Sequence, residues 1–126
     1  MSYLMNLHIG WWGILTGFLY GGLLGLFFYQ ENWQGGYISW KRRMLRLGHI
    51  SFFGIGFINL FFFFTCIYLN TSKEGIPSQL LAISTFLMPL ICTLSAFWPR
   101  FRHFFFLPVM CLILATTLFI LNEFIV

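Results

Sequence analysis

Four long apolar runs, separated by short polar segments, constrain this chain more than any other feature of its sequence. Each run can supply the roughly 20 residues that an α-helix needs to cross the hydrocarbon core of a bilayer. Only 8% of the residues are charged, whereas a soluble domain carries about 25% because charged groups cover its surface. We therefore expect the surface of this chain to face lipid rather than water.

The runs predict four transmembrane helices within one membrane domain that covers residues 1–126. Because the connecting segments are short, consecutive helices should be antiparallel. We therefore expect an all-α fold in which the four helices form an up-and-down bundle. The N-terminal segment lacks the basic region and cleavage site of a secretory signal, so we expect the first run to be retained. The predicted helices span about residues 9–28, 47–69, 79–98 and 103–124.

The cations divide unevenly between the connecting segments, and this division predicts the orientation of the bundle. Six of the seven Lys and Arg residues lie in the connections 29–46 and 98–103, and the seventh is Lys73. Positively charged loops stay on the cytoplasmic side of a membrane. We therefore expect both basic connections to be cytoplasmic and both termini to lie outside, in a bacterial inner (cytoplasmic) membrane.

The charged residues also argue against several classes of function. The net charge of +4 does not indicate nucleic-acid binding, because the cations cluster at the ends of apolar runs. The three acids, Glu31, Glu74 and Glu123, each lie at a segment end, so no pair of carboxylates is available for general acid–base catalysis. Walker loops, nucleophile elbows and metal-ligand spacings do not occur in the sequence. We expect neither an enzyme nor a metal site.

Glycines recur every four residues along the first predicted helix, at Gly13, Gly17, Gly21 and Gly25. Because a helical turn has 3.6 residues, these glycines form a slanting groove on one face of the helix. Small residues at this spacing let two helices approach closely in lipid. We expect the glycine face to pack against a helix of this chain or of another membrane subunit. Close approach of a flat cofactor, a pigment or a lipid is the alternative.

Asn59 lies well inside the second predicted helix. An amide side chain in hydrocarbon needs hydrogen-bond partners within the protein, because lipid tails offer none. We expect these partners on a neighbouring helix, so that Asn59 joins the glycines as a residue that holds helices together.

Two histidines are the best candidates for chemistry. His49 and His103 begin the second and fourth predicted helices, so both should lie near the basic side at similar depth. If these helices face each other across a simple bundle, the imidazoles could ligate haem b, or contact a chlorin or a quinone. Arg46, Arg100 and Arg102 would then pair with the haem propionates. The alternatives are hydrogen bonds to helix ends or to a partner, and contact with lipid headgroups.

These patterns favour a small, non-catalytic structural or accessory subunit of a larger membrane complex. The chain offers little extramembrane mass, but its glycines and its 18 phenylalanines provide ample packing surface. Energy-transducing complexes of respiration or photosynthesis carry such subunits, which makes them our working hypothesis. The expected partners are other integral membrane subunits at the glycine face, together with lipids. A haem- or quinone-binding anchor that uses His49 and His103 stays open, as does a small oligomeric channel or transporter.

Overall fold

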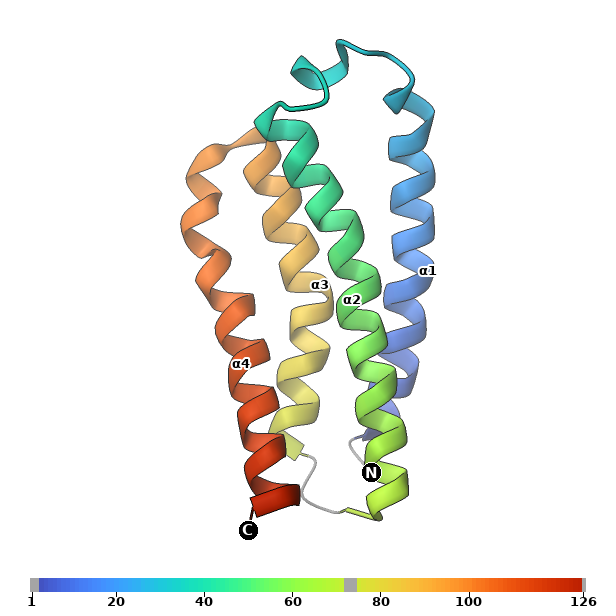
Figure 1. Ribbon diagram of the computed structural model, residues 1–126, viewed down its shortest axis with the longest axis vertical. Helices are drawn as coiled ribbons and strands as arrows, with labels where there is room; N and C mark the ends of the chain where they lie inside the picture. The colour runs from blue at the N-terminus through green and yellow to red at the C-terminus, as the bar shows by residue number, and fades with distance from the viewer. Residues whose placement is uncertain (1–2, 72–74, 126) are drawn as a thin grey trace.

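The computed structural model describes residues 3–71 and 75–125, whose long elements are all helices (Figure 1). Within these residues, four helices are long and apolar enough to cross a membrane, which confirms this part of the prediction. They are α1 (Tyr3–Phe28), α2 (Trp40–Leu69), α3 (Gly75–Phe97) and the α4 segment (Phe106–Ile120) with its flanking turns. The shorter elements are the 3-10 helices η1 (Trp33–Gly35) and η2 (Pro99–Phe105) and the π-helical turn η3 (Leu121–Ile125).

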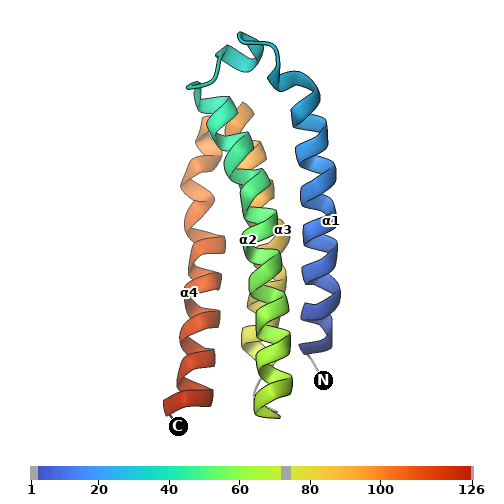
Figure 2. The same ribbon diagram turned by 45° about the vertical axis from the view of Figure 1, so that its right-hand side comes forward.

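Consecutive helices run in opposite directions, so the start of α1 and the end of α4 lie at the same end of the molecule (Figure 1). The two central helices are α2 and α3, which are also the most buried of the four. α1 packs against both of them, whereas α4 packs on α3 from the opposite side (Figure 2). The arrangement is therefore a central pair with two flanking helices, and not a square bundle in which each helix has two equivalent neighbours.

α2 begins at Trp40 rather than at residue 47, so the first cations lie on a helix and not in a loop. Ser39 is the N-cap, and its Oγ accepts a hydrogen bond from the backbone N–H of Arg42 (3.3 Å). A serine in this position satisfies an amide that has no partner within the helix. Because Lys and Arg are good helix formers, the charged segment 40–46 continues the helix towards the connection with α1.

The other helices differ from the prediction mainly at their ends. α1 begins at Tyr3 rather than at residue 9, because the polar Asn6 is fully buried against other helices. α4 begins at Phe106 rather than at residue 103, because the preceding residues form the 3-10 helix that starts with Pro99. Polar residues and prolines at the ends of an apolar run thus made the predicted boundaries imprecise.

A close contact between backbones joins α1 to α2 at Gly10 and Gly56. A Cβ added to Gly10 would lie 3.0 Å from the carbonyl oxygen of Gly56, and one added to Gly56 would lie 3.1 Å from the carbonyl oxygen of Gly10. Side chains larger than hydrogen would push these two helices apart. The absence of a side chain at both positions therefore allows α1 to approach the central pair.

Candidate functional site

A buried polar cluster joins the three helices α1, α2 and α3. Its members are Asn6, Asn59, Ser78 and Thr85, and the solvent exposure of each is 0%. The Nδ2 group of Asn6 donates to Oδ1 of Asn59 (2.7 Å) and to the backbone carbonyl of Ser78 (3.1 Å). The hydroxyl of Ser78 donates in return to Oδ1 of Asn6. We call these four residues the asparagine cluster.

Asn59 links the cluster from α2 to both neighbouring helices. Besides accepting from Asn6, it donates from Nδ2 to the carbonyl oxygen of Ile55 (2.8 Å) and to Oγ1 of Thr85 (2.9 Å). Thr85 donates its own proton to the carbonyl oxygen of Leu81 (3.0 Å). These groups find their partners inside the chain, as hydrocarbon surroundings require. The asparagine cluster therefore fixes how the helices pack. Its amide groups form hydrogen bonds within the chain rather than with a ligand.

Three of the four glycines in the sequence pattern contact helices of the same chain. A Cβ added to Gly13 would lie 2.7 Å from the nearest atom of α3. At Gly17 and Gly21, the added atom would lie 3.0 Å and 2.2 Å from the nearest atom of α2. Gly25 has no such neighbour within 4 Å. Most of the glycine face is thus occupied by the chain's own helices and is not open to another subunit.

The structure does not bring His49 and His103 together. His49 points towards α1, where its Nε2 lies 2.2 Å from the position that a Cβ on Gly21 would take, and its ring packs edge-on against Phe53. His103 is exposed on η2, which packs against α3 and α4. Because α4 flanks α3 and not the α1 side of α2, the two imidazoles do not face each other. The condition for haem ligation by this pair is therefore not met in this arrangement.

The arginines named as partners of a haem do not converge on one site either. The guanidinium carbon of Arg46 lies 4.1 Å from the ring centroid of Tyr37, and Arg46 donates to the Tyr37 carbonyl (3.2 Å). Arg100 and Arg102 are exposed on η2. In the described part of the chain, no three His, Cys, Asp or Glu side chains come close enough to hold a metal ion.

Arg42 has a structural role that sequence reasoning missed. It is only 3% exposed, although it carries a charge. Its guanidinium donates to the carbonyls of Phe28 (2.9 Å) and Glu31 (3.1 Å), and it lies 4.9 Å from the ring centroid of Phe28. Because the last carbonyls of a helix lack partners within it, Arg42 caps the end of α1. Nothing in a run of neighbouring cations marks one of them for this role.

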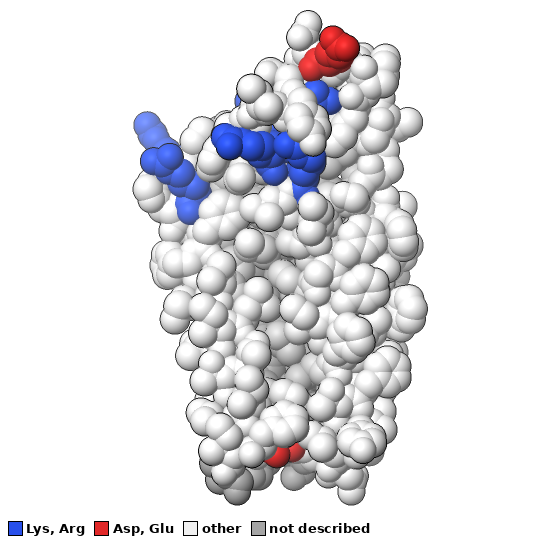
Figure 3. Space-filling view, viewed as in Figure 1, with Lys and Arg blue, Asp and Glu red and all other residues white. Residues whose placement is uncertain are grey.

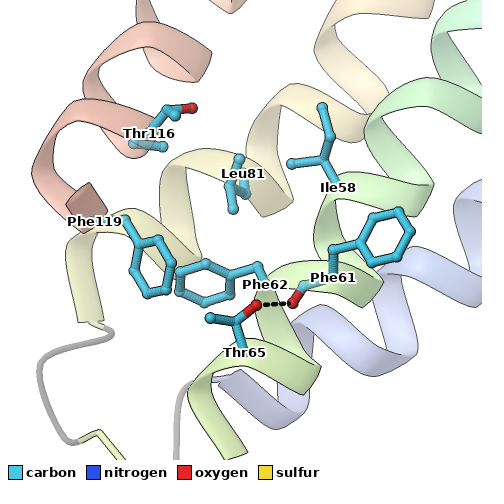
Figure 4. Close-up of a pocket in the computed structure, with 8 residues that line it drawn as sticks. Ile58, Phe61, Phe62, Thr65, Leu81, Thr116 and Phe119 are labelled. Atoms are coloured by element: carbon cyan, nitrogen blue, oxygen red, sulfur yellow. Dashed lines mark hydrogen bonds between the residues drawn. The ribbon is translucent and has the colours of Figure 1, made fainter. Parts of the chain in front are cut away.

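An apolar groove with a volume of about 190 Å³ separates α2 from α4, and α3 contributes to its floor (Figure 4). At one end of the groove, the rings of Phe62 and Phe119 meet with their centroids 4.8 Å apart. The hydroxyls of Thr65 and Thr116 donate to carbonyls of their own helices, each at 2.7 Å. The walls that remain are largely hydrocarbon. The other lining residues of this groove are Ile58, Phe61, Thr65, Leu81, Ala115 and Thr116.

The Lys and Arg residues within 3–71 and 75–125 gather at one end of the molecule, where α1 connects to α2 and α3 connects to η2 (Figure 3). Glu31 belongs to the same end, because it lies in the connection from α1 to α2. Glu123 belongs to the opposite end, where it accepts a hydrogen bond from Thr71 (2.5 Å). The charge of the described residues is therefore asymmetric along the long axis, and we call the end that carries these Lys and Arg residues the basic end.

No protein-family model, curated protein or solved structure matches this chain. Two features of the described residues are suited to binding another molecule. One is the apolar groove between α2 and α4. The other is the basic end, together with the groove between α1 and α3 that extends towards it.

Proposed function

We propose that this protein is a small, non-catalytic subunit of a larger membrane complex, and that a transmembrane helix of a partner subunit docks between α2 and α4. The observation that carries the proposal is the incomplete packing of α4. On one side of the central pair, α1 packs against both α2 and α3. On the other side, α4 packs on α3 and leaves an open groove towards α2.

A helix is the occupant that this groove favours. A comparable arrangement already occurs within the chain, where α1 packs against both α2 and α3. The groove between α2 and α4 offers a similar position, because the exposed side chains of Ile58 and Phe61 form its α2 wall and the exposed Thr116 belongs to its α4 wall. Helices in lipid associate mainly through van der Waals packing of such surfaces. A partner helix would supply packing contacts that the open groove lacks.

The proposed partner belongs to an energy-transducing complex, respiratory or photosynthetic. This class rests on analogy, because such complexes commonly carry small helical subunits without catalytic groups. We place the proposed partner in the α2–α4 groove rather than at the glycine face. The support for this choice is that Gly13, Gly17 and Gly21 contact helices of the same chain.

We further propose that the basic end faces the cytoplasm, with the protein in a bacterial inner (cytoplasmic) membrane. The described Lys and Arg residues gather at that end of the molecule (Figure 3). Cytoplasmic segments of membrane proteins carry an excess of Lys and Arg, because positive charge resists translocation. Both ends of the chain would then lie outside.

Photo-crosslinking in native membranes tests the docking site. A photoreactive phenylalanine analogue replaces Phe61, which lines the groove and is 69% exposed. Phe18 of α1 is the matched control, because it is 65% exposed and lies away from the groove. Irradiation should join position 61 to a discrete partner protein, whereas position 18 should yield lipid adducts. A protein crosslink at position 18 without one at position 61 would overturn the groove as the docking site.

A further inference from the structure

A second groove lies on the other side of the central pair, between α1 and α3. Its volume is about 310 Å³. Tyr20 of α1 and Phe52 of α2 form one part of its lining, and α3 supplies Phe86, Leu90 and Thr93. Because its lining residues Phe86 and Leu90 are exposed, the groove is open at the surface of the molecule and accessible from the lipid phase.

The polar atoms in this groove already have partners. The hydroxyls of Tyr20 and Thr93 are hydrogen-bonded to each other (2.8 Å). Thr93 donates its proton to the carbonyl oxygen of Pro89 (2.8 Å), so Tyr20 is the donor in the pair. With both protons used, the groove presents mainly aromatic rings and methyl groups. Such walls suit a hydrocarbon chain.

Lys41 lies beyond this groove, towards the basic end of the molecule. Its position on α2 relative to groove-lining residues shows this. Lys41, Gly48 and Phe52 lie on one face of the helix, because separations of 7 and 11 residues are close to whole turns. Phe52 lines the groove. A Cβ added to Gly48 would lie 3.6 Å from the hydroxyl of Tyr20. The same face of α2 therefore leads from the groove to Lys41.

The face of α3 gives the same placement. Phe97 follows Leu90 by 7 residues, so it continues the groove-lining face towards the basic end. The Nζ atom of Lys41 lies 6.0 Å from the ring centroid of Phe97. From Phe86 to Phe97 the helix rises about 16 Å, which is about half of the ~30 Å hydrocarbon core. The groove and its continuation thus match the depth of one leaflet.

We propose that this groove binds an anionic phospholipid, with one acyl chain along the α1–α3 seam and the phosphate on the ammonium group of Lys41. Charge complementarity supports this occupant. Lys41 is exposed and has no ion pair among the described residues. An ammonium group donates charge-assisted hydrogen bonds to phosphate oxygens. The site is separate from the α2–α4 groove and does not depend on the partner helix proposed there.

Native mass spectrometry of the full chain in detergent tests the headgroup site. Phosphatidylglycerol and phosphatidylcholine with identical acyl chains are compared, because only the former is anionic. The unmodified protein should bind phosphatidylglycerol more tightly. Lys41→Gln should weaken that binding about fivefold, which corresponds to one interfacial cation. Arg102→Gln removes an exposed cation at the same end, and it should change that binding by less than about twofold, because Arg102 lies on η2 and not on the α2 face that leads to the groove.

Equal affinity for the two lipids, or equal losses in the two variants, would overturn the site. The acyl-chain part is tested by Leu90→Trp, since Leu90 lines the groove and is 53% exposed. This change should reduce binding of both lipids, whereas Leu114→Trp on α4 should not. Unchanged binding in Leu90→Trp, with helical content intact by circular dichroism, would exclude the groove. Because Phe61 belongs to the other groove, its crosslinking result is independent.

Discussion

At the scale of single residues, the position of a hydroxyl group decides what it contributes to stability. Thr85 and Thr116 both donate to a carbonyl four residues earlier in their own helix. Only Thr85 is fully buried and also accepts a hydrogen bond, from Asn59. The two threonines therefore form a matched pair, in which the same substitution removes either a contact between helices or a bond within one helix.

Thr85→Val should lower the free energy of unfolding by about 1 kcal/mol, because the Asn59 amide loses an acceptor in a site without water. Thr116→Val should change it by less than about 0.5 kcal/mol, since only an exposed bond within one helix is lost. Equilibrium unfolding in mixed micelles measures both variants. Equal destabilisation by the two substitutions would contradict a special role for the asparagine cluster.

The sequence indicates that Asn59 needs partners, because an amide in hydrocarbon cannot remain unpaired. It does not identify them. Asn6 and Thr85 lie 53 and 26 residues away along the chain, so only the packing of three helices brings the groups together. The predicted first helix begins at about residue 9, so the sequence places Asn6 before it and does not indicate that this side chain is buried.

At the scale of the helices, the contact of α1 with α2 depends on two glycines that the four-residue pattern did not mark. Gly56→Ala would place a Cβ 3.1 Å from the carbonyl oxygen of Gly10, so the helices must separate. We expect a loss of about 1–3 kcal/mol in the free energy of unfolding. Gly54 lies on the same helix but has no neighbour within 4 Å.

Gly54→Ala should therefore stabilise the protein by up to about 1 kcal/mol, because alanine favours a helix over glycine. The opposite signs of the two substitutions, measured by the same unfolding method, distinguish packing from helix propensity. Two changes of the same sign would contradict a close backbone contact at Gly56. Sequence spacing shows which glycines share a face, but the fold decides which face meets another helix.

The connection from α1 to α2 depends on Arg42. Arg42→Gln removes charge-assisted hydrogen bonds to the carbonyls of Phe28 and Glu31. A hydrogen bond to a charged group contributes about 1.5–3 kcal/mol to the free energy of unfolding. We expect chymotrypsin to cleave the aromatic-rich segment 29–39 several times faster in this variant. Arg43→Gln is the matched control, because Arg43 is exposed and its guanidinium lies 5.9 Å from the ring centroid of Trp40. Equal cleavage rates in the two variants would contradict the capping role.

At the scale of the whole molecule, the four apolar helices follow from the sequence, but their arrangement does not. Length and composition identify each membrane-length helix. The expectation that His49 faces His103 assumed a square bundle, whereas α2 and α3 form a central pair with α4 against α3. Apolar residues surround each helix almost evenly, so the sequence carries little information on which neighbours a helix selects.

The proposed orientation predicts the behaviour of reporter fusions. Alkaline phosphatase joined to the C-terminus should be active in a bacterial host, and green fluorescent protein at the same position should stay dark, because the proposed orientation puts that end outside. Fusions made after Arg102, beyond three helices, should show the reverse pattern. Fluorescence at the C-terminus without phosphatase activity would contradict a cytoplasmic basic end.

The central claim, that this chain is a subunit, predicts that it does not occur alone in its membrane. The most direct measurement is the mass and composition of the particle obtained when the tagged protein is extracted from native membranes with a mild detergent. The expected result is a protein mass, after bound detergent and lipid are subtracted, that is well above the 14.8 kDa of the chain and includes a second integral membrane protein at a fixed ratio. A stable monomer that carries only detergent and lipid would contradict the claim.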